Sequence, residues 1–120
     1  MRLALVLAIL LLSTPLAANL SELTNSQRLF FAIARVENCR SWNNPGCLKF
    51  ARQKGARRGP RGYAVFKTLA LGRRALSLQI DRYKGMKVGH FLRKYNPGVR
   101  GYTRKVLAAS SGLTDTDILD

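Results

Sequence analysis

Apolar side chains recur at steps of three and four residues in four separate segments, and this pattern constrains the fold of the chain most strongly. Such spacing gathers apolar groups on one face of an α-helix. The first segment opens with Thr24 and Gln27 in capping-box spacing, a typical helix start. We therefore expect a mainly α fold, with helices over 24–37, 69–83, 88–95 and 102–109.

The connection between the first two predicted helices has a different composition. Residues 38–60 are rich in Asn, Gly, Pro, Arg and Lys, which favour turns, and the basic stretch 49–61 is expected to be an exposed loop. Tyr63, Val65 and Phe66 then form a short β-favouring run within 62–67. This run predicts one strand of a small hairpin or sheet, a minor β element in an α+β fold.

The first eighteen residues resemble a cleavable secretory signal. Arg2 precedes an apolar run over 3–12, Pro15 breaks it, and small residues follow at Ala17 and Ala18. The run is about half the length needed to cross a bilayer, although an uncleaved anchor is the alternative. We expect a signal peptide over 1–18 and a single domain over 19–120, monomeric, periplasmic or secreted, with no transmembrane segment after cleavage.

The chain is strongly basic, with 21 Lys and Arg against 6 Asp and Glu and a net charge of +15. A surface of this charge attracts anions. For an exported protein the expected partners are anionic cell-envelope polymers. A cationic membrane-binding or nucleic-acid-binding protein is an alternative, but no zinc finger, helix-turn-helix or RNP motif indicates specific nucleic acid recognition.

Cys39 and Cys47 are the two cysteines of the chain. In an oxidising compartment a disulfide is the simplest expectation, and two free buried thiols are the alternative. A closed zinc site needs four ligands, and His90 is the one histidine. We therefore expect no metal and no cofactor.

Glu37 is the carboxylate most suited to chemistry. It ends the apolar stripe of the first predicted helix, where burial would raise its pKa and preserve a proton near neutral pH. Glycosidic cleavage requires such a proton donor. Pairing with Arg35 or Arg40 would be an ordinary structural alternative, and a surface ion pair suffices to explain Asp81.

Several motifs, in order, resemble the small bacterial and phage lysozyme-like domains of the lysozyme and lytic transglycosylase superfamily. The similarity covers about residues 26–113. Its motifs are Ile33-Ala34-Arg35-Val36-Glu37, Asn43-Asn44-Pro45-Gly46 with Leu48, Tyr63-Ala64-Val65-Phe66, His90-Phe91-Leu92-Arg93-Lys94-Tyr95-Asn96-Pro97, and Tyr102. The resemblance implies a lysozyme-like α+β fold, a peptidoglycan-cleaving glycosidase, and Glu37 as the catalytic acid at the end of a helix beside the sugar cleft.

The resemblance also bears on mechanism. Water-adding glycosidases usually employ two carboxylates, whereas lytic transglycosylases, as the resemblance implies, use one Glu as acid and then as base. One usable Glu favours a lytic transglycosylase, with a lysozyme-type muramidase as the alternative. Relatives commonly have Gly or Ser after the Glu, whereas Asn38 and Cys39 follow here. An inactive wall-binding or scaffold protein is therefore a second interpretation.

The candidate contacts to peptidoglycan glycan strands are amide and aromatic side chains. The amides could bind acetamido groups, and the aromatic rings could stack on sugars, although each residue also suits a structural role in a turn or in the core. Trp42 could line the cleft or cover the disulfide. The predicted substrate-binding residues are Asn43, Asn44, Tyr63, Tyr95 and Tyr102.

Overall fold

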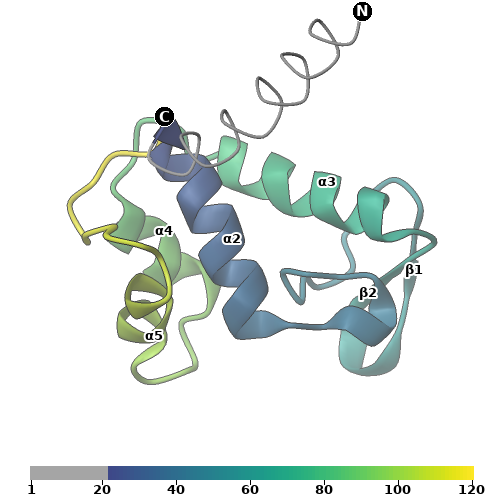
Figure 1. Ribbon diagram of the computed structural model, residues 1–120. Helices are drawn as coiled ribbons and strands as arrows, with labels where there is room; N and C mark the ends of the chain where they lie inside the picture. The colour runs from purple at the N-terminus through teal and green to yellow at the C-terminus, as the bar shows by residue number, and fades with distance from the viewer. Residues whose placement is uncertain (1–21) are drawn as a thin grey trace, which may run out of the picture.

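The computed structural model describes residues 22–120, and the predicted signal peptide lies outside the described residues. This part of the chain forms four α-helices and one two-stranded antiparallel sheet, which confirms the coarse expectation of an α fold with a minor β element (Figure 1). The elements in chain order are α2 (Asn25–Glu37), η1 (Arg40–Trp42), β1 (Ala56–Arg58), η2 (Pro60–Gly62), β2 (Ala64–Phe66), α3 (Leu69–Asp81), α4 (Val88–Tyr95) and α5 (Tyr102–Ala108).

Helix α2 runs through the middle of the molecule, where it contacts both α3 and α5 (Figure 1). The Thr24 side chain accepts a hydrogen bond from the Gln27 backbone N–H, and the Gln27 side chain accepts one from the Thr24 N–H. This reciprocal pair confirms the predicted start. At the other end Asn38 adopts the left-handed conformation and donates its N–H to the Ala34 carbonyl. The helix therefore stops directly after Glu37.

The apolar stripes of the helices meet in one core. Its members share exposures of 5 % or less, and they are Leu29, Ala32, Ile33, Leu76, Ile80, Val88, Phe91, Leu92, Tyr102, Val106, Leu113 and Leu119. Helix α3 ends at Asp81, earlier than the expected Tyr83, because the Tyr83 and Lys84 N–H groups bond the carbonyls three residues earlier, those of Ile80 and Asp81, and so form tighter turns. The pattern placed the other three helices within one or two residues of their observed ends.

The hairpin corrects one expectation. Residues 49–61 were expected to form a loop, but Ala56–Arg58 is a strand that pairs with β2, Arg57 lying opposite Val65. Both arginines of β1 are exposed, so this strand lacks the apolar alternation that would have predicted it. Its backbone pairing with the more apolar β2 forms the sheet.

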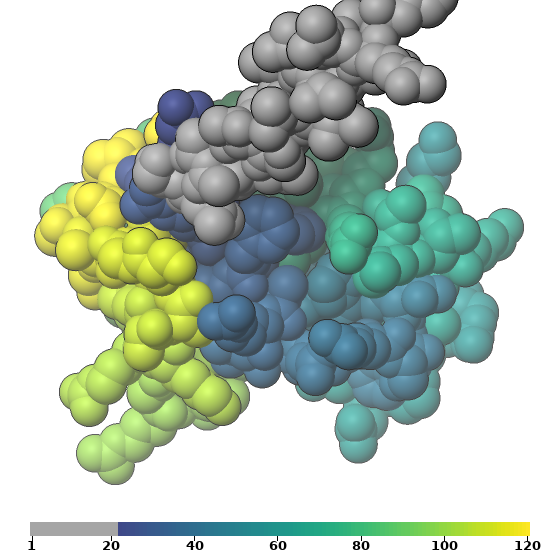
Figure 2. All heavy atoms as spheres, in the orientation of Figure 1, coloured from purple at the N-terminus to yellow at the C-terminus, as the bar shows by residue number. Residues whose placement is uncertain are grey.

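The C-terminal residues are held against the rest of the molecule, although the ends of a chain are often mobile. Leu119 is buried and exchanges backbone hydrogen bonds with Gly85 and Met86, at 2.8 and 2.9 Å. Asp115 pairs with Arg93 at 3.2 Å, and the last residues lie beside the start of α2 (Figure 2). One buried leucine and these tertiary contacts anchor the terminus.

None of the helices within residues 22–120 has the length and apolar character needed to cross a membrane.

Candidate functional site

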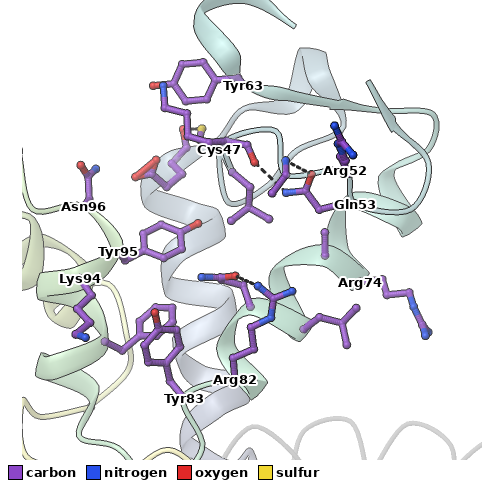
Figure 3. Close-up of a pocket in the computed structure, with 18 of the residues that line it drawn as sticks. Cys47, Arg52, Gln53, Tyr63, Arg74, Arg82, Tyr83, Lys94, Tyr95 and Asn96 are labelled. Carbon is purple, nitrogen blue, oxygen red and sulfur yellow. Dashed lines mark hydrogen bonds between the residues drawn. The ribbon is translucent and has the colours of Figure 1, made fainter. Parts of the chain in front are cut away.

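Glu37 lies in the wall of a cavity of about 590 Å³. The other walls come from the segment 47–54, Tyr63, α3 and α4, so the cavity separates the hairpin and α3 from the end of α4 (Figure 3). Glu37 is the one carboxylate that residues 22–120 contribute to the lining. Its place at the end of α2 follows from the left-handed cap at Asn38, which turns the chain away after the carboxylate.

The surroundings of Glu37 raise the pKa of its carboxyl group. Burial raises its pKa, while polar interactions with Tyr102 and Asn96 and the charge of Lys105 act in the opposite direction. Burial has the larger effect, so the pKa is raised overall, as the sequence predicted. The Tyr102 hydroxyl faces this carboxyl without reaching standard hydrogen-bond geometry.

The structural alternative for Glu37 was an ion pair with Arg35 or Arg40. Within residues 22–120 the ion pairs are Lys84 with Asp81 and Arg93 with Asp115, so neither arginine pairs with Glu37. The Lys84–Asp81 pair, at 3.9 Å and exposed, confirms the simple interpretation of Asp81. A partly buried carboxyl that forms no ion pair with residues 22–120 is suited to proton transfer.

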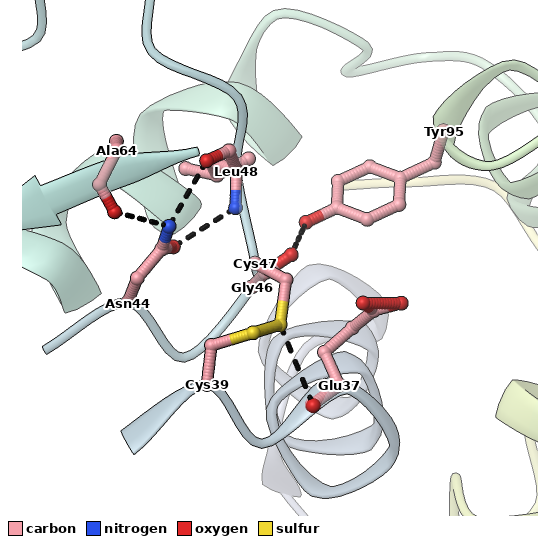
Figure 4. The surroundings of a disulfide bond; sticks show 8 residues. All are labelled: Glu37, Cys39, Asn44, Gly46, Cys47, Leu48, Ala64 and Tyr95. Atoms are coloured by element: carbon pink, nitrogen blue, oxygen red, sulfur yellow. Dashed lines mark hydrogen bonds between the residues drawn. A yellow bond between two sulfur atoms is a disulfide. The ribbon is translucent and has the colours of Figure 1, made fainter. Parts of the chain in front are cut away.

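The predicted disulfide between Cys39 and Cys47 is present, with a Cα–Cα distance of 5.3 Å. Cys47 lines the cavity, and its Sγ lies 3.4 Å from the Glu37 carbonyl oxygen (Figure 4). The bridge therefore holds the segment after α2 against the end of the helix that carries Glu37.

The two asparagines of the predicted substrate-binding set hold the turn that the disulfide closes. Asn44 is fully buried, and its amide bonds the Leu48 carbonyl, the Leu48 N–H and the Ala64 carbonyl at 2.9 to 3.0 Å (Figure 4). The Asn43 amide donates to the Phe66 carbonyl at 3.1 Å. Neither asparagine lines the cavity. Their side chains thus connect the turn to β2, which is the structural role.

Tyr63 and Tyr95 line the cavity. The Tyr63 ring stacks on Trp42 with centroids 5.2 Å apart, and the Lys49 ammonium lies 3.6 Å from its centroid. Trp42 supports Tyr63 and is not itself a lining residue. Tyr95 donates its hydroxyl to the Gly46 carbonyl oxygen. Both tyrosines are positioned to contact a ligand along an edge or face of the ring.

Tyr102 differs from the other two tyrosines because it is only 4 % exposed and lies outside the cavity lining. Its ring stacks on Tyr95 with centroids 6.2 Å apart. Tyr102 can therefore act on Glu37 from the core side, and it does not present a face to a sugar ring.

Sequence reasoning assigned no role to several polar residues of the site. Asn96 lines the cavity beside Glu37, and its position directly before Pro97 at the end of a helical stripe was the available signal. The lining also contains two glutamines, Gln53 and Gln79, and six cationic residues: Lys49, Arg52, Lys54, Arg74, Arg82 and Lys94. The sequence contains 21 Lys and Arg, and no local pattern distinguishes the six cationic residues of the lining from the others.

Clusters of three or more His, Cys, Asp or Glu side chains that could hold a metal ion do not occur within residues 22–120. No protein-family model matches the chain, and comparison with curated proteins and with solved structures found no match. The arrangement of one carboxyl with a raised pKa, amide side chains, two tyrosine rings and several cations can bind an anionic or polyhydroxylated ligand and donate a proton to it.

Proposed function

We propose that this protein cleaves the glycan strand of peptidoglycan at the bond from N-acetylmuramic acid to N-acetylglucosamine, as a lytic transglycosylase. We further propose that residues 19–120 form a lysozyme-like domain and that the signal over 1–18 directs it to the periplasm or outside the cell. The observation that carries the proposal is the Glu37 carboxyl, whose pKa is raised by burial in the wall of a cavity of about 590 Å³.

The proposed reaction uses Glu37 twice. The protonated carboxyl donates its proton to the glycosidic oxygen as the bond from that oxygen to the muramic acid C1 breaks. The carboxylate then removes the proton of the C6 hydroxyl of the same sugar, and the C6 oxygen bonds to C1. The products are a 1,6-anhydro sugar and a shortened strand, and Glu37 regains its proton.

Residues around Glu37 support both steps. Asn96 and Tyr102 interact with the charged form of the carboxyl, which stabilises it after proton donation. The absence of a second carboxylate from the cavity lining favours attack by the sugar's own hydroxyl, since a water-adding enzyme usually requires another carboxylate. Tyr63 and Tyr95 supply ring surfaces for sugar contacts.

The test is digestion of purified sacculi followed by mass analysis of the soluble products. We expect anhydro-muropeptides from the wild type and none from Glu37→Gln, which retains size and hydrogen bonding but cannot donate the proton. The matched control is Asp81→Asn, an exposed carboxylate in a surface pair, which should release products at the wild-type rate.

Other outcomes identify the alternatives. Hydrated reducing ends would indicate a muramidase. Binding to sacculi without any product would indicate a wall-binding or scaffold protein, which the net charge of +15 also favours. Undiminished release by Glu37→Gln would falsify the role of Glu37.

A further inference from the structure

The cavity contains one carboxyl group and has cations on more than one side. Tyr95, Asn96 and Lys94 lie on one side, with Tyr95 and Asn96 near Glu37, and Arg52 and Arg74 lie on the opposite side (Figure 3). Arg82, on the segment that follows α3, lies between the two sides in the same view. A ligand that extends from Glu37 across the cavity would therefore meet several cations on the far side.

These cations are available to a ligand. Lys54 joins the three arginines in the lining, and all four side chains are exposed. Within residues 22–120, none of the four forms an ion pair with a carboxylate. Exposed cations that face a cavity without an anionic partner favour an anionic ligand.

The loop that carries Arg52 is held in shape. The Gln53 side chain accepts a hydrogen bond from the Ala51 N–H at 2.8 Å and donates one to the Lys49 carbonyl at 2.9 Å. Arg52 itself adopts a left-handed φ of 60°, a conformation that costs free energy for a residue with a Cβ. A restrained loop lowers the entropy lost when its arginine binds.

Arg82 is also oriented. Its Nη1 donates a hydrogen bond to the Gln79 Oε1 at 3.2 Å, and both residues line the cavity. Arginine has a planar donor group that matches the two oxygens of a carboxylate. Carboxylates are therefore the anions that this wall fits best within the proposed substrate.

In a stem-bearing peptidoglycan strand the lactyl carboxyl of each muramic acid forms an amide bond with the peptide, so the free carboxylates of the strand are on the peptide stems. We propose that Arg52, Lys54, Arg74 and Arg82 bind the carboxylates of these peptide stems, so that the protein acts on stem-bearing strands in preference to denuded glycan. This inference rests on the proposed function, because it assigns the substrate class of the same site.

The experiment compares two substrates: soluble uncrosslinked strands with their peptides, and the same strands after an amidase has removed the peptides and left a lactyl carboxylate on each muramic acid. The measured quantity is kcat/KM for each, by mass analysis of the released products. The variant is Arg52→Gln/Arg74→Gln/Arg82→Gln. Its control is Arg57→Gln/Arg73→Gln/Arg104→Gln, which removes the same charge from exposed arginines outside the cavity lining.

We expect the wild type and the control variant to prefer stem-bearing strands, and the preference to weaken at high salt. Each exposed charge pair changes affinity by about twofold to fivefold, so the cavity variant should lower kcat/KM on stem-bearing strands by about tenfold. Its kcat/KM on denuded strands should fall by less than on stem-bearing strands, because only the lactyl carboxylates next to the sugar rings remain as anions. Thermal unfolding of each variant checks that the fold is retained.

Equal kcat/KM on the two substrates for the wild type would overturn the inference, as would an equal loss in both triple variants. Cosedimentation of Glu37→Gln with each kind of strand measures binding without cleavage. It therefore tests stem recognition separately from the proposed cleavage activity. Stem-dependent binding that the cavity substitutions abolish would support the cationic wall even if no strand were cleaved. Stem-independent binding would overturn it even if cleavage occurred.

Discussion

The Tyr95 hydroxyl donates a hydrogen bond to the Gly46 carbonyl oxygen and so joins the end of α4 to the disulfide-closed turn, 49 residues earlier (Figure 4). Burial and the nearby Glu37 charge raise the pKa of Tyr95, which keeps this hydroxyl protonated as a donor. Tyr95 and Cys47 both line the cavity. The bond therefore ties two walls of the candidate site together.

Replacing Tyr95 with Phe removes this bond and leaves the buried Gly46 carbonyl without its partner. We expect the free energy of unfolding to fall by about 1 to 2 kcal/mol, measured by urea denaturation. Tyr63→Phe is the control, because the Tyr63 hydroxyl makes no hydrogen bond with the residues at 22–120. An equal loss of unfolding free energy in both variants would contradict a stabilising role for the Tyr95–Gly46 hydrogen bond.

Gly72 allows α3 to approach the turn before the hairpin. A Cβ at this buried position would overlap the Asn43 carbonyl oxygen, a backbone atom that cannot rotate away. We expect Gly72→Ala to lower the free energy of unfolding by about 3 kcal/mol despite the better helix propensity of alanine. Gly98→Ala, where a Cβ meets nothing within 4 Å, should change stability little in the same denaturation assay.

The disulfide closes a short loop, with a sequence separation of 8 between Cys39 and Cys47. Loop entropy predicts that Cys39→Ala/Cys47→Ala lowers the free energy of unfolding by about 2.5 kcal/mol. The activity on sacculi should fall as well, because Cys47 holds the end of α2 beside Glu37. The wild type should lose comparable stability in a reductant while the double variant does not respond, and a response by the variant would count against this explanation.

The raised pKa of Glu37 has a defined effect on stability. The folded protein keeps the Glu37 proton at pH values where the unfolded chain, with an ordinary value of 4.5, has lost it. The folded state then binds more protons than the unfolded state, so the free energy of unfolding decreases as pH rises from 4.5 through the folded pKa.

Glu37→Gln has no carboxyl to titrate at this position. Its free energy of unfolding should therefore rise relative to that of the wild type as pH increases from 4.5 through the folded pKa of Glu37. Above the folded pKa the difference should become constant. Denaturation of both proteins at a series of pH values measures it, and a difference that does not change with pH would show that burial does not raise the pKa. The rate of strand cleavage should also fall above the folded pKa, where the acid has lost its proton.

The helices were predictable because their signals are local. Capping partners such as Thr24 and Gln27 are three residues apart, and apolar stripes repeat within a single turn. The Cys39–Cys47 bridge also follows from two nearby positions in the chain. Glu37 was identifiable for the same reason, since it ends the stripe of α2.

Strand β1, the buried C-terminus and the role of Asn44 depended on contacts between segments that are distant in the sequence. Strand β1 forms because β2 pairs with it, and Leu119 is buried because the turn at Gly85 accepts the C-terminal chain. Neither event leaves a periodic pattern in the residues concerned. The sequence also left Asn44 open as a ligand contact, and only packing against Leu48 and Ala64 committed its amide to the turn.

The sequence by itself determined the helices, the disulfide and a single carboxylate at a helix end, because these depend on residues within a few positions of one another. The tertiary structure decided which side chains face that carboxylate. It placed Tyr102 behind Glu37 and Asn96 beside it, and it brought six of the many cations of the chain into the lining of the same cavity. Burial and long-range packing set these positions, and neither depends on local spacing.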